Sequence, residues 1–453
     1  MDIEYKSSAT IHLDDLCEQI EQNTKVDTAD YDMFNIKRGL RNSDGTGVMA
    51  GLTSVCNVEG YYIDDGETVP REGRLRFRGI NMKYVVEGCE AENRFGYEEI
   101  VWLLIFGSLP TKEQLEGFTK LLSDNRELPD DFIEDMIMKA PSPDIMNKMA
   151  RSVLALYSYD SNPDETTLRN VLRQCLQILA KMPEIMGNAY QVKRRTYYKQ
   201  TMSISPTVPG HTTAQSILDA IKPGYADDEA KLLDTCLMVH AEHGGGNNST
   251  FATRVLTSSG TDTYSAIAAG IGALKGPRHG GANIKVTEMT RLMREKITDV
   301  YNDGQIADYL AKIVRKEAGD GSGLIYGMGH AVYTLSDPRA VILKSRAKQF
   351  CTGTEYEEDF LLLDAIERLT PEVFRAAKGS GKAMCANVDL YSGLVYRVLQ
   401  IPEDLFTPIF TVARMAGWSA HRMEELLTGN RIIRPAYKSV AKPGKYIPIE
   451  ERK

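Results

Sequence analysis

The chain of 453 residues lacks any patterned set of cysteines. Its seven cysteines are scattered and form no C-x-x-C pair, which is typical of reduced thiols and predicts a cytoplasmic protein. The acidic start, Met1 to Tyr5, lacks the layout of a signal peptide or a transit peptide. Apolar runs such as residues 100–106 fall far short of the ~20 residues that a membrane span needs, so we expect no such span.

An excess of positive charge is also missing. The 54 Lys and Arg against 62 Asp and Glu give a formal net charge of −8, which argues against a general binder of nucleic acid or anionic membranes. A local basic pocket for an anionic ligand remains compatible with this balance. The hydrophobic content of 42% is sufficient for a sizeable core, and the length suits two or three domains.

No internal repeat, low-complexity segment or regular alternation of strands and helices is present, which argues against a doubly wound sheet. Residues 1–45 are polar and predict a helical or partly ordered lead-in, and residues 46–80 predict a few short strands. Apolar spacing predicts a helix over 165–180, with Pro183 just beyond its end. Similar patterns predict further helices over 97–106, 114–123, 231–240, 286–297, 306–317, 358–368 and 406–427. A predominantly α-helical protein follows.

Four of the seven histidines lie between residues 240 and 330, among glycines and other small residues, and this clustering indicates an enzyme. His240 and His243 have an H-x-x-H spacing that could place both imidazoles on one helical face, so a zinc site is one interpretation. No further ligand recurs nearby at a suitable spacing. The alternative is a helix that ends at the glycines 244–246, with two interfacial histidines.

His279 stands at a break between two helices. Gly276 and Pro277 end the preceding helix, and a new helix can begin near Ala282. The positive potential of a helix N-terminus favours a neutral imidazole, which can donate one hydrogen bond to a carbonyl. A solvated histidine in a turn is the alternative.

His330 follows Gly327 and Gly329, which allow a ligand to approach the backbone closely. Arg339 comes nine residues later. Because a guanidinium binds a carboxylate in a bidentate manner, this arginine suits the recognition of a carboxylate substrate.

Two isolated charges lie in apolar stretches. Asp389 is flanked by Val388 and Leu390, so desolvation can tune its pKa and make it a proton shuttle. Arg414 has small and apolar neighbours and requires an anionic partner, either a ligand or an internal carboxylate. Arg434 follows beyond the C-terminal helix.

Taken in order, these segments resemble citrate synthase, and the similarity extends from about residue 46 to 437. Six ordered motifs make a chance coincidence negligible. They are H-x-x-H-x-x-x-N at 240–247, L-K-G-P-x-H-G-G-A-N at 274–283, G-x-G-H-x-V-Y-x-x-x-D-P-R at 327–339, N-V-D-x-Y-S-G at 387–393, A-R-x-x-G-W-x-A-H at 413–421 and R-x-x-R-P at 431–435.

The resemblance implies an all-α, two-domain helical fold with a few short strands near the N-terminus. It implies a large domain of residues 1–278 and 394–453, with the lead-in 1–45, and a small domain of residues 279–393 that closes over it. It also implies a homodimer or a higher homo-oligomer with shared active sites.

The resemblance further implies a reaction and its residues. Asp389 would remove a methyl proton from acetyl-CoA, His279 would stabilise the enol or enolate oxygen, and His330 would polarise the carbonyl of oxaloacetate. The remaining implied positions bind substrates. They are Arg339, Arg414 and Arg434 for carboxylates, with Arg434 from the neighbouring subunit, His243 and Phe410 for the pocket, and Leu324, Gly327, Gly329 and Asn387 for coenzyme A.

This reading needs no metal and no cofactor, because coenzyme A enters as a thioester substrate, and it involves neither nucleic acid nor membrane. The nearest alternative is 2-methylcitrate synthase, which would use propionyl-CoA at the same residues. A citryl-CoA lyase, a non-catalytic sensor of acyl-CoA and a metal hydrolase built on His240 and His243 are further alternatives.

Overall fold

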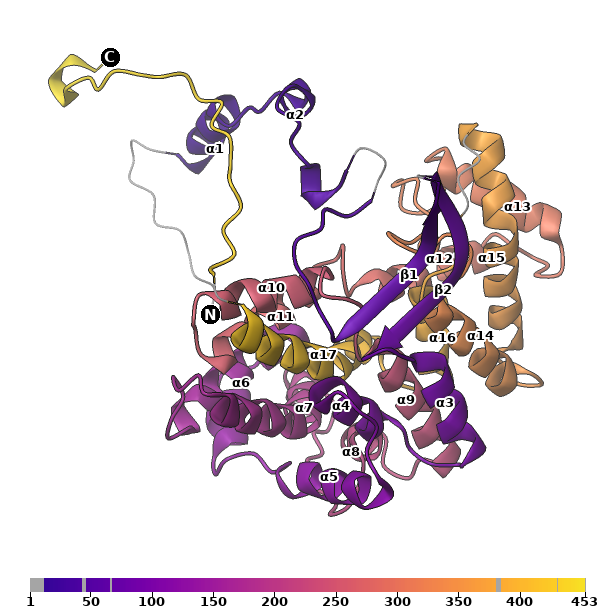
Figure 1. Ribbon diagram of the computed structural model, residues 1–453. Helices are drawn as coiled ribbons and strands as arrows, with labels where there is room; N and C mark the ends of the chain where they lie inside the picture. Colours follow the sequence, from indigo (N-terminus) through magenta and orange to yellow (C-terminus); the bar gives the residue numbers. More distant parts are fainter. Residues whose placement is uncertain (1–11, 43–45, 66, 380–383, 430, 453) are drawn as a thin grey trace. The chain divides into compact units, whose positions relative to one another are not determined.

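The computed structural model describes residues 12–42, 46–65, 67–379, 384–429 and 431–452, and helices dominate it (Figure 1). The first helices are α1 (Leu13–Asn23), α2 (Thr28–Met33), α3 (Met82–Ala91), α4 (Tyr97–Phe106), α5 (Lys112–Asp124), α6 (Ile145–Leu156), α7 (Leu168–Tyr197), α8 (Thr213–Ile221) and α9 (Asp227–His240). The later helices are α10 (Asn248–Ser258), α11 (Thr263–Lys275), α12 (Ala282–Arg294), α13 (Asp303–Val314), α14 (Pro338–Cys351), α15 (Glu357–Lys378), α16 (Asp389–Val398) and α17 (Phe406–Thr428).

The short helical turns are η1 (Arg38–Leu40), η2 (Ile133–Met138), η3 (Tyr157–Tyr159), η4 (Glu403–Leu405) and η5 (Ile449–Glu451). No helix among the described residues is both long and apolar enough to cross a membrane. The predominantly helical fold expected from the sequence is confirmed, and each helix expected from apolar spacing overlaps an observed one.

One helix boundary differs from the expectation. The helix expected to end before Pro183 continues through this proline, and α7 runs to Tyr197. A proline inside a helix removes one backbone hydrogen bond and costs about 3 kcal/mol. The second half of α7 buries apolar side chains, among them Ile185, Met186 and Val192, and this burial offsets the cost. The helix also begins later than expected, at a cap where the Thr167 hydroxyl accepts from a backbone N–H.

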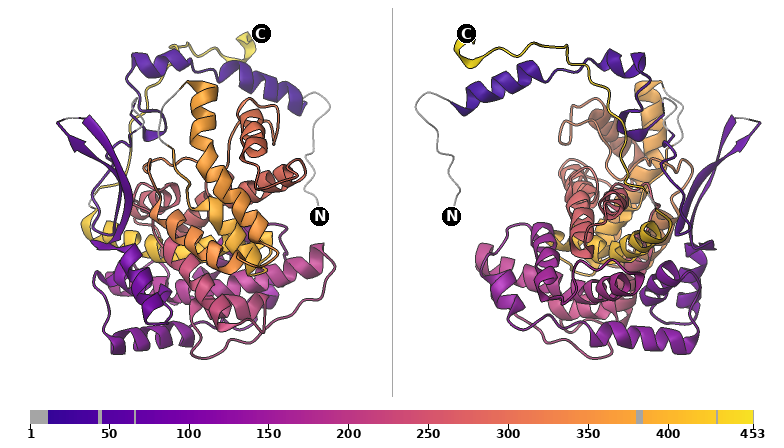
Figure 2. Two further views of the ribbon diagram at one scale, coloured as in Figure 1. Left: turned by 90° about the vertical axis from the view of Figure 1, so that its right-hand side faces the viewer. Right: turned by 60° about the vertical axis from the view of Figure 1, so that its left-hand side comes forward.

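The expected strands form one antiparallel sheet of β1 (Cys56–Asp64), β2 (Glu67–Phe77) and β3 (Ile80–Asn81), in the order β1-β2-β3. The hairpin of β1 and β2 is seen in both views of Figure 2. A Cβ at Gly60 would lie 2.3 Å from the carbonyl oxygen of Val332. The hairpin therefore packs closely against the backbone that follows His330.

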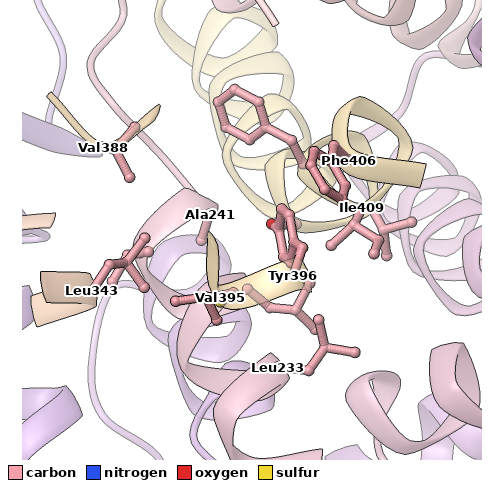
Figure 3. Close-up of a cluster of buried hydrophobic side chains, with 14 of the residues drawn as sticks. Leu233, Ala241, Leu343, Val388, Val395, Tyr396, Phe406 and Ile409 are labelled. Atoms are coloured by element: carbon pink, nitrogen blue, oxygen red, sulfur yellow. The ribbon is translucent and has the colours of Figure 1, made fainter. Parts of the chain in front are cut away.

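The core is built around α17, whose residues from Phe406 to Glu425 are all buried. This helix contacts α4, α7, α9, α10 and α11. Figure 3 shows the part of the core where Leu233 of α9 and Tyr396 of α16 lie beside Ile409 of α17. A charged side chain on this part of α17 is therefore buried in an apolar interior.

The chain divides into two compact units. The terminal unit comprises Met1–Ala50 and Arg434–Lys453, and the central unit comprises Gly51–Ile433. In the terminal unit, α1 and α2 confirm a helical lead-in for the described residues, whereas the expectation for 1–11 and 43–45 lies outside them. The division into a large domain and a small domain at 279 and 393 stays a prediction.

Candidate active site

The segment after α9 carries the first two histidines of the site. His240 is the last residue of α9, and His243 lies in the loop beyond it, so of the two interpretations of this segment the structure fits a helix that ends before the glycines and not two imidazoles on one helical face. The helix ends at the residue that apolar spacing predicted, and Gly244, with a φ of 91°, gives the loop beyond it a left-handed turn. Burial, together with the positive charge of Arg339, lowers the pKa of both rings well below the usual value, so both are neutral.

A zinc site needs at least three protein ligands. Within the described ranges, no group of three or more His, Cys, Asp or Glu side chains is placed to hold a metal ion. The H-x-x-H pair therefore has no third ligand from this part of the chain, and the metal-hydrolase interpretation gains no support from the geometry.

His279 lies in the turn between α11 and α12, and α12 begins at Ala282 as expected. Its Nε2 atom is 3.1 Å from Asn247 Oδ1 and 3.1 Å from Ser249 Oγ. Burial and the charge of Arg414 lower the pKa of His279 to about 4. The ring is therefore neutral near pH 7, and its two contacts on Nε2 leave the Nδ1 edge facing away from them.

The backbone around Gly327 and Gly329 pairs with a segment that is distant in sequence. Both glycines are left-handed, with φ of 81° and 89°. The backbone N–H of Asn387 donates to the Gly327 carbonyl at 2.9 Å, and its side-chain amide donates to the Gly329 carbonyl at 2.9 Å. This pairing brings His330 beside the N-terminus of α16.

Hydrogen bonds determine which nitrogen of His330 carries the proton. Its Nδ1 atom accepts the backbone N–H groups of Val332 and Tyr333, both at 3.0 Å. An Nδ1 that accepts has no hydrogen of its own, so the ring hydrogen is on Nε2. The ring stacks on Tyr333 with 4.5 Å between ring centres and lies 5.0 Å from the ring centre of His243.

Asp389 is the first residue of α16 and is half-buried. Burial raises its pKa to about 6, although the charges of Arg339 and Arg414 lower it. Asn387 Oδ1 accepts the Asp389 backbone N–H at 3.0 Å and anchors the start of the helix. The carboxyl group is ionised at neutral pH and is a stronger base than an ordinary aspartate.

Arg339 lies in the first turn of α14 and is buried together with Asp337. Its Nε atom donates to Asp337 Oδ1 at 3.0 Å, and a terminal nitrogen donates to Asp337 Oδ2 at 2.7 Å. This bidentate contact is the kind that Arg339 was expected to make with a substrate carboxylate, and that role stays a prediction. A ligand would therefore bind the edge of the guanidinium that does not face Asp337.

Arg414 lies on α17 and is fully buried. Its Nε atom donates to the His240 carbonyl at 2.7 Å, and its Cζ atom lies 4.6 Å above the ring centre of Phe410. Neither terminal nitrogen has a hydrogen-bond partner among the described residues. Burial lowers its pKa to about 10, so the guanidinium stays charged and has two donors ready for an anion.

The structure thus brings together seven of the predicted site residues, which are linked by the contacts and charge effects given above. They are His243, His279, His330, Arg339, Asp389, Phe410 and Arg414. Leu324 is exposed in the loop before Gly327, and the side chain of Asn387 is already bonded to backbone. Arg434 is exposed and belongs to the terminal unit, so its participation stays a prediction.

Sequence reasoning did not select several polar residues that hold these groups in place. Trp418 donates to Ser249, which in turn contacts His279, and Asp337 holds Arg339. Asp337 was visible in the D-P-R motif as the residue that precedes a helix. Glu242 and His421, which form a fully buried pair, left no signal beyond their places in two of the motifs.

Comparison with known proteins gives a consistent family assignment. The family model described as citrate synthase, C-terminal domain, matches residues 44–436. The citrate synthase of Synechocystis sp. is 32% identical over 414 residues, which cover 90% of this chain and 92% of that protein. The 2-methylcitrate synthase 1 of Corynebacterium glutamicum is 29% identical and covers 92% and 98% of the two chains.

Among solved structures, the citrate synthase of the archaeon Thermoplasma acidophilum matches with a TM-score of 0.72 and 25% identity. The match covers 92% of this chain and 99% of the archaeal one. That protein was solved as a ternary complex with carboxymethyl coenzyme A and oxaloacetate.

Proposed function

Because the chain belongs to the citrate synthase family, we propose that it condenses acetyl-CoA with oxaloacetate and water to give citrate and free CoA. Membership of the family makes the chain an acyltransferase (EC 2.3.3.-) that converts an acyl group into an alkyl group on transfer. The observation that carries the proposal is the buried Arg414, whose two terminal nitrogens have no hydrogen-bond partner among the described residues and whose charge acts on neutral histidines and an aspartate of raised pKa. Such a site suits oxaloacetate, which carries two negative charges, and a thioester whose methyl protons are weakly acidic.

The first step is enolisation of the thioester. Its methyl proton is very weakly acidic, so its removal needs a positioned base and a donor at the carbonyl oxygen. Asp389 takes the proton, and its raised pKa makes the transfer easier. His279 donates from Nδ1 to the oxygen on which negative charge develops, which requires the ring hydrogen on Nδ1 and Nε2 to accept from the Ser249 hydroxyl. Because the imidazole is neutral, it donates this hydrogen bond without placing a full positive charge beside the substrate.

The second step is the attack of the enol carbon on the keto carbon of oxaloacetate. The Nε2–H of His330 points away from the two backbone groups that hold Nδ1, so it is the atom that polarises and protonates the keto oxygen. Arg339 and Arg414 bind the carboxylates of oxaloacetate, and His243 and Phe410 shape the pocket. Water then hydrolyses the thioester of the condensed intermediate.

Coenzyme A is proposed to bind along the loop from Leu324 to Gly329 and at Asn387. No cofactor is proposed, because the thioester is itself a substrate. All seven cysteines are unpaired, which supports a reducing compartment, and we propose that the enzyme works in the cytoplasm and serves the tricarboxylic acid cycle.

The choice between acetyl-CoA and propionyl-CoA rests on one methyl group, which a pocket discriminates by about 1–3 kcal/mol, or roughly 10- to 200-fold. Relatives of both kinds match this chain. The test measures kcat/KM from thiol release with each thioester in the presence of oxaloacetate. We expect acetyl-CoA to be preferred by at least about tenfold.

Several outcomes would change this proposal. A preference for propionyl-CoA would identify a 2-methylcitrate synthase. Cleavage of citryl-CoA without net formation of citrate would identify a lyase, and binding of acyl-CoA without any thiol release would identify a sensor. Reactions without oxaloacetate measure the background hydrolysis of the thioester.

A further inference from the structure

The buried carboxylate of Glu242 lies between the two site histidines of the segment 240–243 and has no exposed surface. Its Oε1 atom accepts the backbone N–H of Gly244 at 2.5 Å and lies 3.1 Å from His421 Nε2. Its Oε2 atom has no hydrogen-bond partner among the described residues. A buried carboxylate is unfavourable unless positive charge compensates it, so the source of that charge is informative.

His421 does not supply the compensating charge. Arg254 lies 2.9 Å from His421 Nδ1, and because a guanidinium can only donate, Nδ1 must accept. The ring is therefore neutral, with its hydrogen on Nε2, and it donates that hydrogen to Glu242. His421 orients the carboxylate without neutralising it.

Arg254 does not supply the charge either. Its guanidinium forms ion pairs with Glu424 at 2.9 Å and with Glu425 at 2.8 Å. Two carboxylates already balance its single positive charge. Glu242 must therefore find its counter-charge elsewhere.

Arg414 is a second cation that acts on Glu242. Burial lowers the pKa of Arg414, and the charge of Glu242 opposes this fall; His421 is the neighbour that lowers the pKa of Glu242 most, and the charge of Arg414 lowers it further. The geometry agrees, because Gly417 lies one helical turn after Arg414 on α17, and a Cβ there would lie 1.9 Å from Glu242 Oε2. Because Gly417 has no side chain, the carboxylate of Glu242 can lie against the face of α17 that also carries Arg414.

The two groups nevertheless do not bond to each other. No ion pair joins Glu242 and Arg414 within the described ranges, and both terminal nitrogens of Arg414 lack a protein partner. The counter-charge thus acts through space, and the donors of Arg414 stay available.

We propose that Glu242, oriented by His421, sets the anion affinity of the active site: it balances Arg414 in the free enzyme and limits how tightly carboxylate ligands are held. This inference rests on the proposed function, because it takes Arg414 as a ligand for substrate carboxylates. The negative charge of Glu242 would speed product release. Citrate carries more carboxylates than oxaloacetate, so without Glu242 the charge of Arg414 would slow the dissociation of citrate.

The test replaces the charge and keeps the shape. Glu242→Gln preserves an oxygen that can accept from Gly244 and His421, but it removes the negative charge. We expect oxaloacetate and citrate to bind about tenfold more tightly by calorimetry, because the ligand now supplies the missing counter-charge. The KM for oxaloacetate and kcat should both fall, and citrate should inhibit more strongly.

The matched control is Glu425→Gln, which also removes a buried carboxylate, one that faces Arg254 instead of Arg414. It is expected to lower thermal stability without changing the affinity for oxaloacetate. A loss of structure alone would weaken anion binding, so tighter binding separates an electrostatic role from a purely structural one.

A second variant serves if Glu242→Gln does not fold. Glu242→Met removes the negative charge, keeps a similar volume and avoids burying a second amide, so it should tighten anion binding in the same direction. Unchanged or weaker binding of both anions in the folded variant overturns the inference. If the wild-type protein itself binds neither oxaloacetate nor citrate, the proposed function fails instead, so the two failures are distinguishable.

Discussion

At Asp389, burial and neighbouring charge act in opposite directions on one carboxyl group. Desolvation raises its pKa to about 6, and the two site arginines keep it from rising further. At the histidines, burial and the same arginines act together and lower the pKa values, so these rings are neutral. A group that takes a proton is thus placed beside groups that can donate one hydrogen bond, as proton abstraction next to a carbonyl requires.

The role of Asp389 is tested by its isosteric amide. Asp389→Asn removes the base and keeps the shape, so kcat should fall by about 10²–10⁴ while the dissociation constant of oxaloacetate stays nearly unchanged. Steady-state kinetics and calorimetry measure the two quantities. Asp303→Asn, at an exposed acid on α13, serves as a control that should retain full activity. A variant at Asp389 that keeps a tenth of the wild-type kcat would contradict the assignment.

The pH dependence follows from the same carboxyl group. Below a pH of about 6, Asp389 is protonated and cannot act as a base, so kcat/KM should fall as the pH decreases through about 6 and level off above it. His279, with a pKa of about 4, stays neutral over this range and adds no second limb. Rates measured between pH 5 and 8 in buffers of constant ionic strength test this. A flat profile over that range would show that Asp389 does not limit the reaction.

At the scale of elements, the site depends on the pairing of the 327–329 backbone with the segment that leads into α16. Gly327 makes this approach possible, because its φ is 81° and a Cβ there would lie 2.8–2.9 Å from Leu390. Neither His330 nor Asp389 would keep its place if the two segments separated.

Gly327→Ala should therefore lower both stability and activity. The left-handed conformation costs an alanine about 1–2 kcal/mol, and the clash with Leu390 adds about 1–3 kcal/mol of overpacking. Gly353→Ala is the matched control, because Gly353 is also left-handed, with a φ of 74°, but has open space around it. Denaturant unfolding should show a larger loss at Gly327, together with a fall in kcat that Gly353→Ala does not show. Equal losses at both positions would mean that the contact with Leu390 is unimportant.

At the scale of the whole molecule, closure of one domain over the other is expected. The helices α12 to α16 contact one another and lie on one side of the central unit in Figure 1, which supports a small domain near residues 279–393. His279 and Asp389 bracket that range, so its movement would assemble the site and exclude water. Oxaloacetate should reduce the radius of gyration and protect the junctions from proteolysis. Identical scattering and cleavage with and without ligand would count against closure.

The active site is also predicted to be shared between two subunits. If Arg434 reaches the partner's site, Arg434→Ala should weaken oxaloacetate binding by roughly 1.5–3 kcal/mol. Mixing inactive Asp389→Asn subunits with Arg434→Ala subunits should then restore activity, because each heterodimer regains one intact site. If subunit exchange is verified and activity stays at the level of the parents, the arginine acts within its own chain.

The sequence by itself determined the helical fold and the strand region, and it selected the residues of the candidate site. Apolar spacing located α4, α9 and α17, because one buried face repeats along each of them. His279, His330 and Asp389 could be identified because glycines and apolar neighbours isolate each of them. Each of these signals depends on residues that are close together in the chain, so the sequence alone reveals it.

Only the tertiary structure decided how the charges are partnered. The helix α7 passes through Pro183 because packing outweighs one lost hydrogen bond. Asp337 is paired with Arg339, and Glu242, in the loop after α9, acts on the charge of Arg414 on α17 without a hydrogen bond or ion pair between them in the described chain. Such pairings depend on distances between residues far apart in the chain and on the low dielectric that burial creates, and neither quantity can be read from residue order.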